Sequence, residues 1–309
     1  MADGDSLPSL VVIAGPTASG KSALAVLLAR QYGGEVLNCD AMQVYRGFDI
    51  GTAKLTPEER QGIPHHFLDC CTPDETFSAG EFSRQARLLL PEISSRGALP
   101  IIAGGTGFYI QALLNGLFEG PARNEQLRER LQQREEKRPG SLHRILNRLD
   151  LVAANRIHAN DVQKIIRALE VCLSGRALTD LHQERLPEPL QGYRTIKIFL
   201  NPPREQVYER INQRCIDMFQ KGLLDEVQHL TDQGISPASQ PFSAVGYREA
   251  LAAIRGEIST DRAIELTQIA SRQYAKRQWT WFRRDPDFHF LDGFGTDPEV
   301  IRLARELLD

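Results

Sequence analysis

The stretch GPTASGKS occupies residues 15–22, after the apolar run LVVIA (10–14) and before a helical pattern. Its spacing is that of a phosphate-binding loop, G-x-x-x-x-G-K-[ST]. In such a loop the backbone N–H groups converge on an anion, and the helix that follows adds the positive end of its dipole. The pattern predicts that Lys21 supplies a positive charge to phosphates and that Ser22 supplies a hydroxyl to Mg²⁺. The alternative, a chance match in a surface loop, is disfavoured by the strand before it and the helix after it.

Short apolar runs and helical patterns alternate on either side of this loop. Strands are expected at LVVIA (10–14), EVLNC (35–39), HHFLDC (65–70), LPIIA (99–103) and RTIKIFL (194–200), and a helix over about 20–32. Ser78 and Glu81 form a capping-box pattern that opens a helix running through Arg96. This alternation predicts an α/β fold of the P-loop type, with a doubly wound, mostly parallel sheet.

The composition changes near Pro121. From 121 to about 190 the chain is charged and helical, without a convincing strand. Between Arg123 and Arg148 there are eight Arg or Lys residues against four Glu, a local excess of four positive charges in a chain of net charge −3. We therefore expect a core built from 1–120 and 191–309, with C-terminal helices, and a small helical insert over 121–190.

The composition also bears on the compartment. The five cysteines form no C-x-x-C pair and their number is odd, which favours reduced thiols in the cytoplasm. The N-terminal MADGDSLPSL has no basic region, and no apolar run approaches the length of a membrane span. No coiled-coil heptads demand assembly. We expect a cytoplasmic protein that has no membrane partner and is a monomer.

A hydrolytic ATPase would carry an acid at the end of a second apolar strand. Here LPIIA runs into Gly104–Gly105–Thr106–Gly107 without an acid, whereas Asp40 ends the earlier strand. This arrangement favours a site where Asp40 takes a proton from a second substrate and Thr106 bonds a phosphate oxygen. Asp40 could instead cap the turn that follows it, and Thr106 could merely belong to a tight turn.

Two enzyme classes fit this part of the chain. A nucleotide-dependent small-molecule kinase of the P-loop class would transfer a phosphoryl group from ATP to an alcohol. A transferase would instead hold a leaving pyrophosphate in the loop while carbon moves to a nucleophile. The first third of the sequence leaves both open.

The segment RQYAKRQWTWFRR (272–284) carries five Arg or Lys residues, four aromatic residues and no acid. Positive charge interleaved with flat rings is typical of surfaces that bind splayed nucleotides, and Trp279 or Trp281 could stack on a base. The alternative is a helix whose rings face the core while its arginines face solvent. Together with the basic insert, the segment favours a polyanionic partner.

Several motifs in the same order resemble the tRNA dimethylallyltransferase (tRNA isopentenyltransferase) family in its bacterial form. They are GPTASGKS (15–22), DAMQVYRGFDIGTAK (40–54), GIPHHFLD (62–69), GGTGFY (104–109), NRIHANDVQKIIRALE (155–170), GLLDEV (222–227), VGYREAL (245–251) and AKRQWTWFRRDP (275–286). The resemblance implies transfer of a dimethylallyl group from dimethylallyl diphosphate to N6 of an adenine next to the anticodon in tRNA. Diphosphate would be released, and Mg²⁺ would be required.

The resemblance also implies roles for individual residues. Asp40 would be the general base, with Thr106 and Lys21 on the diphosphate and Ser22 on Mg²⁺. The residues on the diphosphate or nucleotide would be Gly15, Pro16, Thr17, Ala18, Ser19, Gly20, Lys21, Ser22 and Arg214.

Contacts with the tRNA anticodon stem-loop are implied as well. They would fall on Asp40, Ala41, Met42, Gln43, Thr106, Arg128, Gln163, Lys164, Ile165, Ile166, Arg167, Ser243, Ala244, Val245, Gly246, Tyr247, Arg248, Lys276, Arg277, Gln278, Trp279, Thr280, Trp281, Phe282 and Arg283. Ala41 and Ser243 depart from the family's commoner Ser and Arg, which puts a direct contact at these two positions in doubt. No Cys/His pairs follow residue 286, so we expect no C-terminal zinc finger of the eukaryotic kind.

Three other functions remain open beside this one. They are the small-molecule kinase, a relative that prenylates free AMP or ADP, and an RNA-binding switch without catalysis. The basic insert and the 272–284 segment disfavour the first two, because neither class needs a surface for a polyanion.

Overall fold

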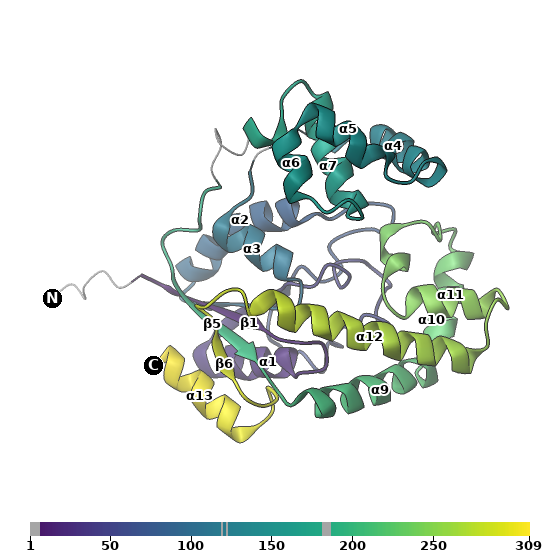
Figure 1. Cartoon of the computed structure of the whole chain (residues 1–309). Coiled ribbons are helices and arrows are strands. Elements are labelled where there is room, and N and C mark those ends of the chain that lie inside the picture. Colours follow the sequence, from purple (N-terminus) through teal and green to yellow (C-terminus); the bar gives the residue numbers. More distant parts are fainter. Residues whose placement is uncertain (1–6, 119, 122, 181–186) are drawn as a thin grey trace. The chain divides into compact units, whose positions relative to one another are not determined.

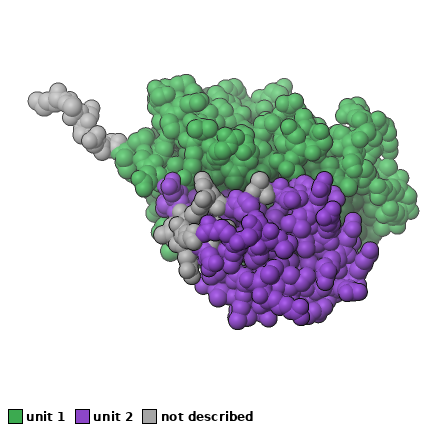
Figure 2. Space-filling view, turned by 90° about the horizontal axis from the view of Figure 1, so that it is seen from above, with its two compact units in different colours: residues 1–114, 190–309 green, residues 115–189 purple. Residues whose placement is uncertain are grey.

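The structure is a computed structural model that describes residues 7–118, 120–121, 123–180 and 187–309. It divides into two compact units, one formed by residues 1–114 and 190–309 and the other by residues 115–189 (Figure 2). The insert expected over 121–190 includes residues 122 and 181–186, which lie outside the described residues.

The first unit is built on a six-stranded sheet with the order β3-β2-β4-β1-β5-β6. All its strand pairs are parallel, which confirms the predicted P-loop-type fold class. The strands are β1 (Ser9–Ala14), β2 (Gly34–Asn38), β3 (His65–His66), β4 (Leu99–Ala103), β5 (Arg194–Leu200) and β6 (His289–Leu291).

Helices cover both faces of this sheet (Figure 1). On one face α1 (Lys21–Tyr32) and α13 (Pro298–Leu308) pack on apolar strand residues such as Val11, Ile13 and Ile101. On the other face lie α2 (Ala79–Ser95) and α3 (Gly107–Asn115). The remaining helices are α9 (Arg204–Gln220), α10 (Leu223–Asp232), the 3₁₀ turn η1 (Gln240–Ser243), α11 (Tyr247–Ile254) and α12 (Thr260–Phe282).

The strand that leads into the phosphate loop lies in the middle of the sheet. Val11 of β1 pairs with Ile101 of β4 on one side and with Ile196 of β5 on the other. β2 pairs with the far side of β4. The carboxyl ends of β2, β4 and β1 are therefore neighbours at one edge, the usual place for ligands in open α/β sheets.

Local sequence signals mostly predicted these elements. Ser78 caps α2 by accepting a hydrogen bond from Glu81 N at 3.1 Å, as the capping-box pattern predicted. The strand predicted over 65–70 was wrong beyond His66. Phe67 and Asp69 adopt φ values of 62° and 53°, left-handed conformations that end a strand.

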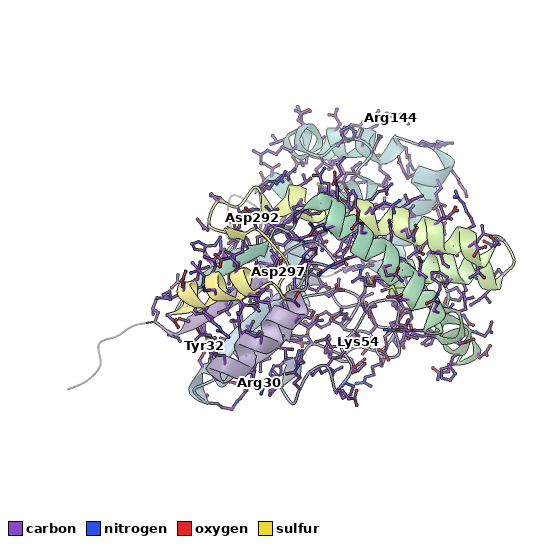
Figure 3. All side chains as sticks on the ribbon, turned by 90° about the horizontal axis from the view of Figure 1, so that it is seen from below. Arg30, Tyr32, Lys54, Arg144, Asp292 and Asp297 are labelled. Carbon is purple, nitrogen blue, oxygen red and sulfur yellow. The ribbon has the colours of Figure 1, made fainter. Side chains whose placement is uncertain are left out.

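The C-terminal segment was not predicted, and it supports the phosphate loop. Asp292 and Asp297 flank the turn between β6 and α13 (Figure 3), and Phe294 N donates to Asp297 Oδ2 at 2.7 Å. Gly295 N in this turn donates to Ser19 O at 2.8 Å. The last strand and helix thus hold the outer side of the loop.

The second unit is helical, with α4 (Glu125–Lys137), α5 (Ser141–Leu149), α6 (Leu151–Arg156) and α7 (Val162–Leu173). Its core is a cluster of apolar side chains from all four helices, including Leu131, Leu142, Ala153 and Ile165. No helix among the described residues is long and apolar enough to cross a membrane. All five cysteines are free.

A buried carboxylate joins α4 to α7 in this unit. The side chain of Glu170 is 2% exposed and accepts two hydrogen bonds from Arg128, at 2.9 and 3.1 Å. Arg167 Nη1, at 2.9 Å, and Asn124 N, at 2.7 Å, also donate to it. Burial alone would raise the pKa of Glu170, but the hydrogen bonds from Arg128, Asn124 and Arg167 outweigh it and lower the pKa to about 2.

We expect this carboxylate to make the stability of the insert dependent on pH. Because the folded-state pKa lies below the usual 4.5, its contribution is complete above pH 4.5 and is lost as the pH falls toward 2. Glu170→Gln should destabilise α4 and α7 by about 3 kcal/mol near neutral pH, because Arg128 is left without its charge partner. Amide hydrogen-exchange protection in these helices measures both effects.

The matched control is Glu129→Gln, since Glu129 is exposed on α4. In this control, the hydrogen-exchange protection of α4 and α7, and its dependence on pH, should equal those of the unchanged protein. Equal protection in the two variants would contradict a stabilising role for Glu170.

Candidate active site

The phosphate loop joins β1 to α1, and its shape depends on close backbone packing. Gly20 has φ 85°, a left-handed conformation that suits glycine, and it is the N-cap of α1. A Cβ at Gly15 would lie 3.0 Å from Leu200 O, so this glycine lets β1 turn beside β5. The N-terminus of α1 is therefore held at the carboxyl edge of the sheet.

Lys21 folds back over this loop. Its Nζ donates to Gly15 O at 3.1 Å and to Pro16 O at 2.8 Å. The pKa of Lys21 falls from its usual 10.5 to about 7, first because of burial and second because of the charge of Arg214, while Asp40 opposes the shift. A bound anion would favour the charged form of this amine.

Arg214 of α9 reaches the same loop. Its Nη2 donates to Thr17 Oγ1 at 2.5 Å, and its buried Nε has no hydrogen-bond partner among the described residues. Burial lowers the pKa of Arg214, while Cys215 and Asp40 oppose the shift. The hydroxyl of Ser19 is likewise buried and finds no partner in the part of the chain that the structure describes. Because buried polar groups normally have partners, these two atoms indicate that the loop is built for an anion.

Asp40 and Thr106 follow β2 and β4, so they lie at adjacent strand ends. Asp40 Oδ1 accepts from Met42 N at 2.9 Å, and Oδ2 has no partner among the described residues. Thr106 Oγ1 accepts from Ala41 N at 3.1 Å, and Thr106 N donates to Cys39 O at 3.3 Å. Asp40 does cap its turn, one of the alternatives above, yet one carboxylate oxygen stays available for a substrate.

A buried lysine orders the loop that bears Asp40. Lys54 (Figure 3) donates to Tyr45 O at 2.8 Å and to the carboxylates of Asp49 and Asp69, each at 2.6 Å. These bonds tie the 40–54 motif to the turn after β3. They explain why both stretches carry charged residues without contributing them to the active site.

The 272–284 segment forms the last turns of α12 with two distinct faces. Lys276, Arg277, Thr280 and Arg283 are exposed, and Trp281 is 38% exposed. By contrast Gln278, Trp279 and Phe282 are buried. Four of the five positive charges of the segment are therefore exposed, while Arg272 is half-buried and donates to Asn212 Oδ1.

Burial corrects the predicted stacking at Trp279. Its ring is 3% exposed, its Nε1 donates to Asn201 Oδ1 at 3.1 Å, and Arg204 packs over it. Such a ring offers no face to a base. Of the two tryptophans only Trp281 keeps an exposed surface, and a Cβ at Gly107 would touch its ring at 2.3 Å.

The 243–248 stretch leads from η1 into α11, and only part of it is accessible. Ser243 and Arg248 are exposed and Ala244 and Val245 are half-buried, whereas Gly246 and Tyr247 are buried. Tyr247 accepts from Gly51 N at 3.2 Å and donates to Glu226 Oε1 at 2.5 Å. We therefore correct the predicted contact through the side chain of Tyr247, which serves the fold.

Within the second unit, the predicted residues of α4 and α7 meet in a groove of about 360 Å³. Its lining includes Arg123, Arg128 and Gln163. Lys164 is exposed nearby in the sequence, and Arg167 is half-buried by its bond to Glu170. Ile165 is a core residue, so its side chain cannot make the predicted contact, whereas Ile166 is 2% exposed and meets the groove only at its floor.

Some residues around the loop were missed by the sequence analysis or given other roles. Gln278 was assigned only to RNA, yet its amide binds two loops of the site. Gly295 lies far away in sequence, and no pattern marks its contact with Ser19. Tyr274, on the same helix as Gln278, has its hydroxyl 3.5 Å from Gly105 O. Helical spacing along α12 could have placed Tyr274 and Gln278 on one side, since they are four residues apart.

The parallel sheet, the loop after its central strand and the cationic groups around that loop define a P-loop-type α/β protein with an anion site. The IPP transferase family model matches residues 43–285. A tRNA dimethylallyltransferase of Solibacter usitatus is 54% identical over 96% of this chain and 97% of its own length. A second tRNA dimethylallyltransferase, of Koribacter versatilis, is 48% identical over 97% of this chain and 98% of its own length.

Two solved structures are also similar. The tRNA isopentenylpyrophosphate transferase of Bacillus halodurans has a TM-score of 0.71 and 37% identity, over 97% of this chain and 96% of that one. A eukaryotic dimethylallyltransferase acting on tRNA has a TM-score of 0.78 and 28% identity, over 94% of this chain and 74% of that one. The chain belongs to the IPP transferase family. This confirms the predicted family and favours a prenyltransferase over the small-molecule kinase.

The lowered pKa of Lys21 gives a prediction for anion binding. Below pH 7 the free protein already carries the ammonium form, whereas above pH 7 it must take up a proton to bind. Affinity for inorganic pyrophosphate should therefore fall above pH 7, by up to about tenfold per pH unit. Calorimetry from pH 6 to 9 measures this dependence.

At each pH, the pyrophosphate affinity of the unchanged protein is divided by that of Lys21→Met. This ratio removes the pH dependence that comes from the ionisation of pyrophosphate itself. Lys221→Met, at an exposed lysine, should behave like the unchanged protein. A constant affinity ratio between the Lys21→Met variant and the unchanged protein would show that Lys21 does not titrate with the ligand.

Proposed function

We propose that the chain transfers a dimethylallyl group from dimethylallyl diphosphate to N6 of an adenine next to the anticodon in tRNA, releasing diphosphate. One observation carries this proposal. Two cations, Lys21 and Arg214, and the unpartnered Ser19 hydroxyl surround the phosphate loop, while the carboxylate of Asp40 lies near enough to act on both cations. The relatives named above support the choice of cargo and acceptor.

The loop would act on the leaving group. As the carbon–oxygen bond breaks, negative charge grows on the diphosphate. Lys21, Arg214 and the loop amides would stabilise that charge more in the transition state than in the bound substrate. The anion would also offset the repulsion between protonated Lys21 and Arg214.

Asp40 would act on the acceptor. The N6 amine of adenine is a weak nucleophile because its lone pair is delocalised into the ring, so a base that takes its proton lowers the barrier. The free Oδ2 suits this role, while the bond from Met42 N to Oδ1 fixes the carboxylate. Thr106, tied to Ala41 N, would hold the neighbouring loop in register.

We further propose that Ser22 holds Mg²⁺ together with the diphosphate. Ser22 is exposed at the start of α1, and its hydroxyl has no protein partner among the described residues. No group of three His, Cys, Asp or Glu residues among the described residues could hold a metal. This suits Mg²⁺, which usually keeps several waters and binds through substrate phosphates. When bound, the ion would neutralise charge on the leaving diphosphate.

The tRNA anticodon stem-loop would bind the exposed basic side chains. In the first unit these are Lys276 and Arg277 of α12, Arg283 directly after it, and Arg248 of α11. In the second unit the groove is lined by exposed Arg123 and by Arg128, which is half-buried and bound to Glu170. Phosphate contacts of this kind position an RNA without reading its sequence. We propose that the protein acts in the cytoplasm as a monomer.

Asp40→Asn tests the base. Asparagine keeps an oxygen for Met42 N but cannot take a proton, so turnover should fall by about 10²–10⁴-fold. Binding of dimethylallyl diphosphate and of anticodon stem-loop RNA should not weaken. Single-turnover prenyl transfer measures the first quantity and calorimetry the second. A normal single-turnover rate would exclude Asp40 as the base.

The function itself is tested by competition between acceptors. The protein is given labelled dimethylallyl diphosphate, ATP, AMP and unmodified tRNA together. Label in tRNA at N6 of an adenine is the expected result. Label in AMP, phosphoryl transfer from ATP, or binding of tRNA without product would each contradict the proposed function.

A further inference from the structure

Gln278 is a buried polar side chain on a helix face that otherwise packs in the core. It is 4% exposed, and both ends of its amide are used. Its Oε1 accepts from Thr17 N at 2.7 Å, and its Nε2 donates to Gly105 O at 3.0 Å. Because burying an amide is costly without hydrogen bonds, these two contacts account for its presence in the core.

The two contacts join loops that leave different strands. Thr17 lies in the phosphate loop after β1, and Gly105 lies just before Thr106 in the loop after β4. Pairing of β1 with β4 extends to Ile13 and Ala103. Beyond the last paired residues of β1 and β4, the side chain of Gln278 links the two loops by hydrogen bonds.

The site is shaped to admit this amide. A Cβ at Gly105 would lie 1.9 Å from Gln278 Nε2, so no other residue type fits there without displacing the glutamine. One turn earlier on α12, the hydroxyl of Tyr274 lies 3.5 Å from the same carbonyl.

Thr17 is held from two sides. Gln278 binds its backbone amide, and Arg214 Nη2 binds its hydroxyl. Arg214 Nε is the buried donor without a partner. The direction in which Arg214 presents this donor therefore depends on Thr17, and the place of Thr17 depends on Gln278.

We propose that Gln278 is a positioning residue for the diphosphate site and not an RNA contact. It fixes the phosphate loop relative to Thr106 and, through Thr17, orients Arg214 toward the leaving group. This inference rests on the proposed function, since it takes the anion to be a diphosphate. It replaces the RNA contact that the resemblance implied for this side chain.

The first test is Gln278→Met, which keeps the volume and removes both hydrogen bonds. The dissociation constant of inorganic pyrophosphate with Mg²⁺, measured by calorimetry on the full chain, should rise about 10- to 30-fold. The affinity for anticodon stem-loop RNA, measured separately, should not change. In turnover, the KM for dimethylallyl diphosphate should rise more than kcat falls.

The matched control is Gln268→Met on the same helix. Gln268 Nε2 donates to Asn212 O at 3.1 Å, a bond between α12 and α9 that does not involve the loops. The control should lower the melting temperature by a similar amount but leave pyrophosphate affinity unchanged. It separates positioning of the site from general stability.

The second variant, Gln278→Glu, gives a pH signature. An ionised glutamate can accept from Thr17 N but cannot donate to Gly105 O, and it adds negative charge beside the anion. A protonated glutamate has the same shape and the same donor and acceptor as glutamine. Pyrophosphate affinity, relative to the unchanged protein at each pH, should therefore recover as the pH falls. Recovery to the affinity of the unchanged protein requires both hydrogen bonds, whereas loss of the carboxylate charge alone would restore only the affinity of Gln278→Met.

Two results would overturn the inference. One is a Gln278→Met variant whose pyrophosphate affinity equals that of Gln268→Met, and the other is an equal loss of RNA and pyrophosphate binding. The proposed function fails separately, if the unchanged protein binds pyrophosphate in a Gln278-dependent way but prenylates no tRNA. An unchanged protein that binds no pyrophosphate would overturn both.

Discussion

The site depends on positive charge that the protein itself does not balance. Lys21 lies close enough to Arg214 for the charge of the arginine to lower the pKa of the lysine. The negative charge of Asp40 opposes the lowering of the pKa at both residues. Protein interiors rarely leave such charges or donors without partners. The fold can hold this arrangement because its stability comes from an apolar sheet core that the site does not interrupt. The electrostatics of the loop therefore favour an anion that supplies negative charge.

Strand order determines which groups can act on that anion. With β4 between β1 and β2, the phosphate loop, Thr106 and Asp40 follow three adjacent strands. The end of β4 carries glycines instead of an acid, so nothing there is placed to activate water in the way of a hydrolytic ATPase. The carboxylate of Asp40 comes instead from the loop after β2, on the far side of β4 from the phosphate loop. The carboxylate and the phosphate loop therefore follow different strands, with the loop that bears Thr106 following the strand between them.

Short-range patterns predicted the central strands, the cap at Ser78 and the helical insert, because each depends on neighbours in sequence. The predictions that were wrong or missing concern segments whose conformation depends on contacts between residues far apart in the sequence. The strand at 65–70 stops early because Phe67 and Asp69 turn to positive φ, a conformation that their residue types do not signal. β6 has three residues, too few for a periodic pattern. The inward direction of Trp279 was within reach, since Ala275, Trp279 and Phe282 follow helical spacing, but its charged neighbours favoured an outward face.

The same spacing marks where α12 departs from an ordinary core helix. Its buried positions include Thr267, Ser271 and Gln278, where apolar residues would be expected. Thr267 bonds its own helix at Ala263 O, and Ser271 lies beside the thiol of Cys215. Only Gln278 sends its polar atoms to the two loops of the site. A polar residue thus takes a buried helix position where its hydrogen bonds support the site. The basic residues lie on the other side of the same helical turns. One helix would therefore serve both the diphosphate site and the RNA surface that we propose.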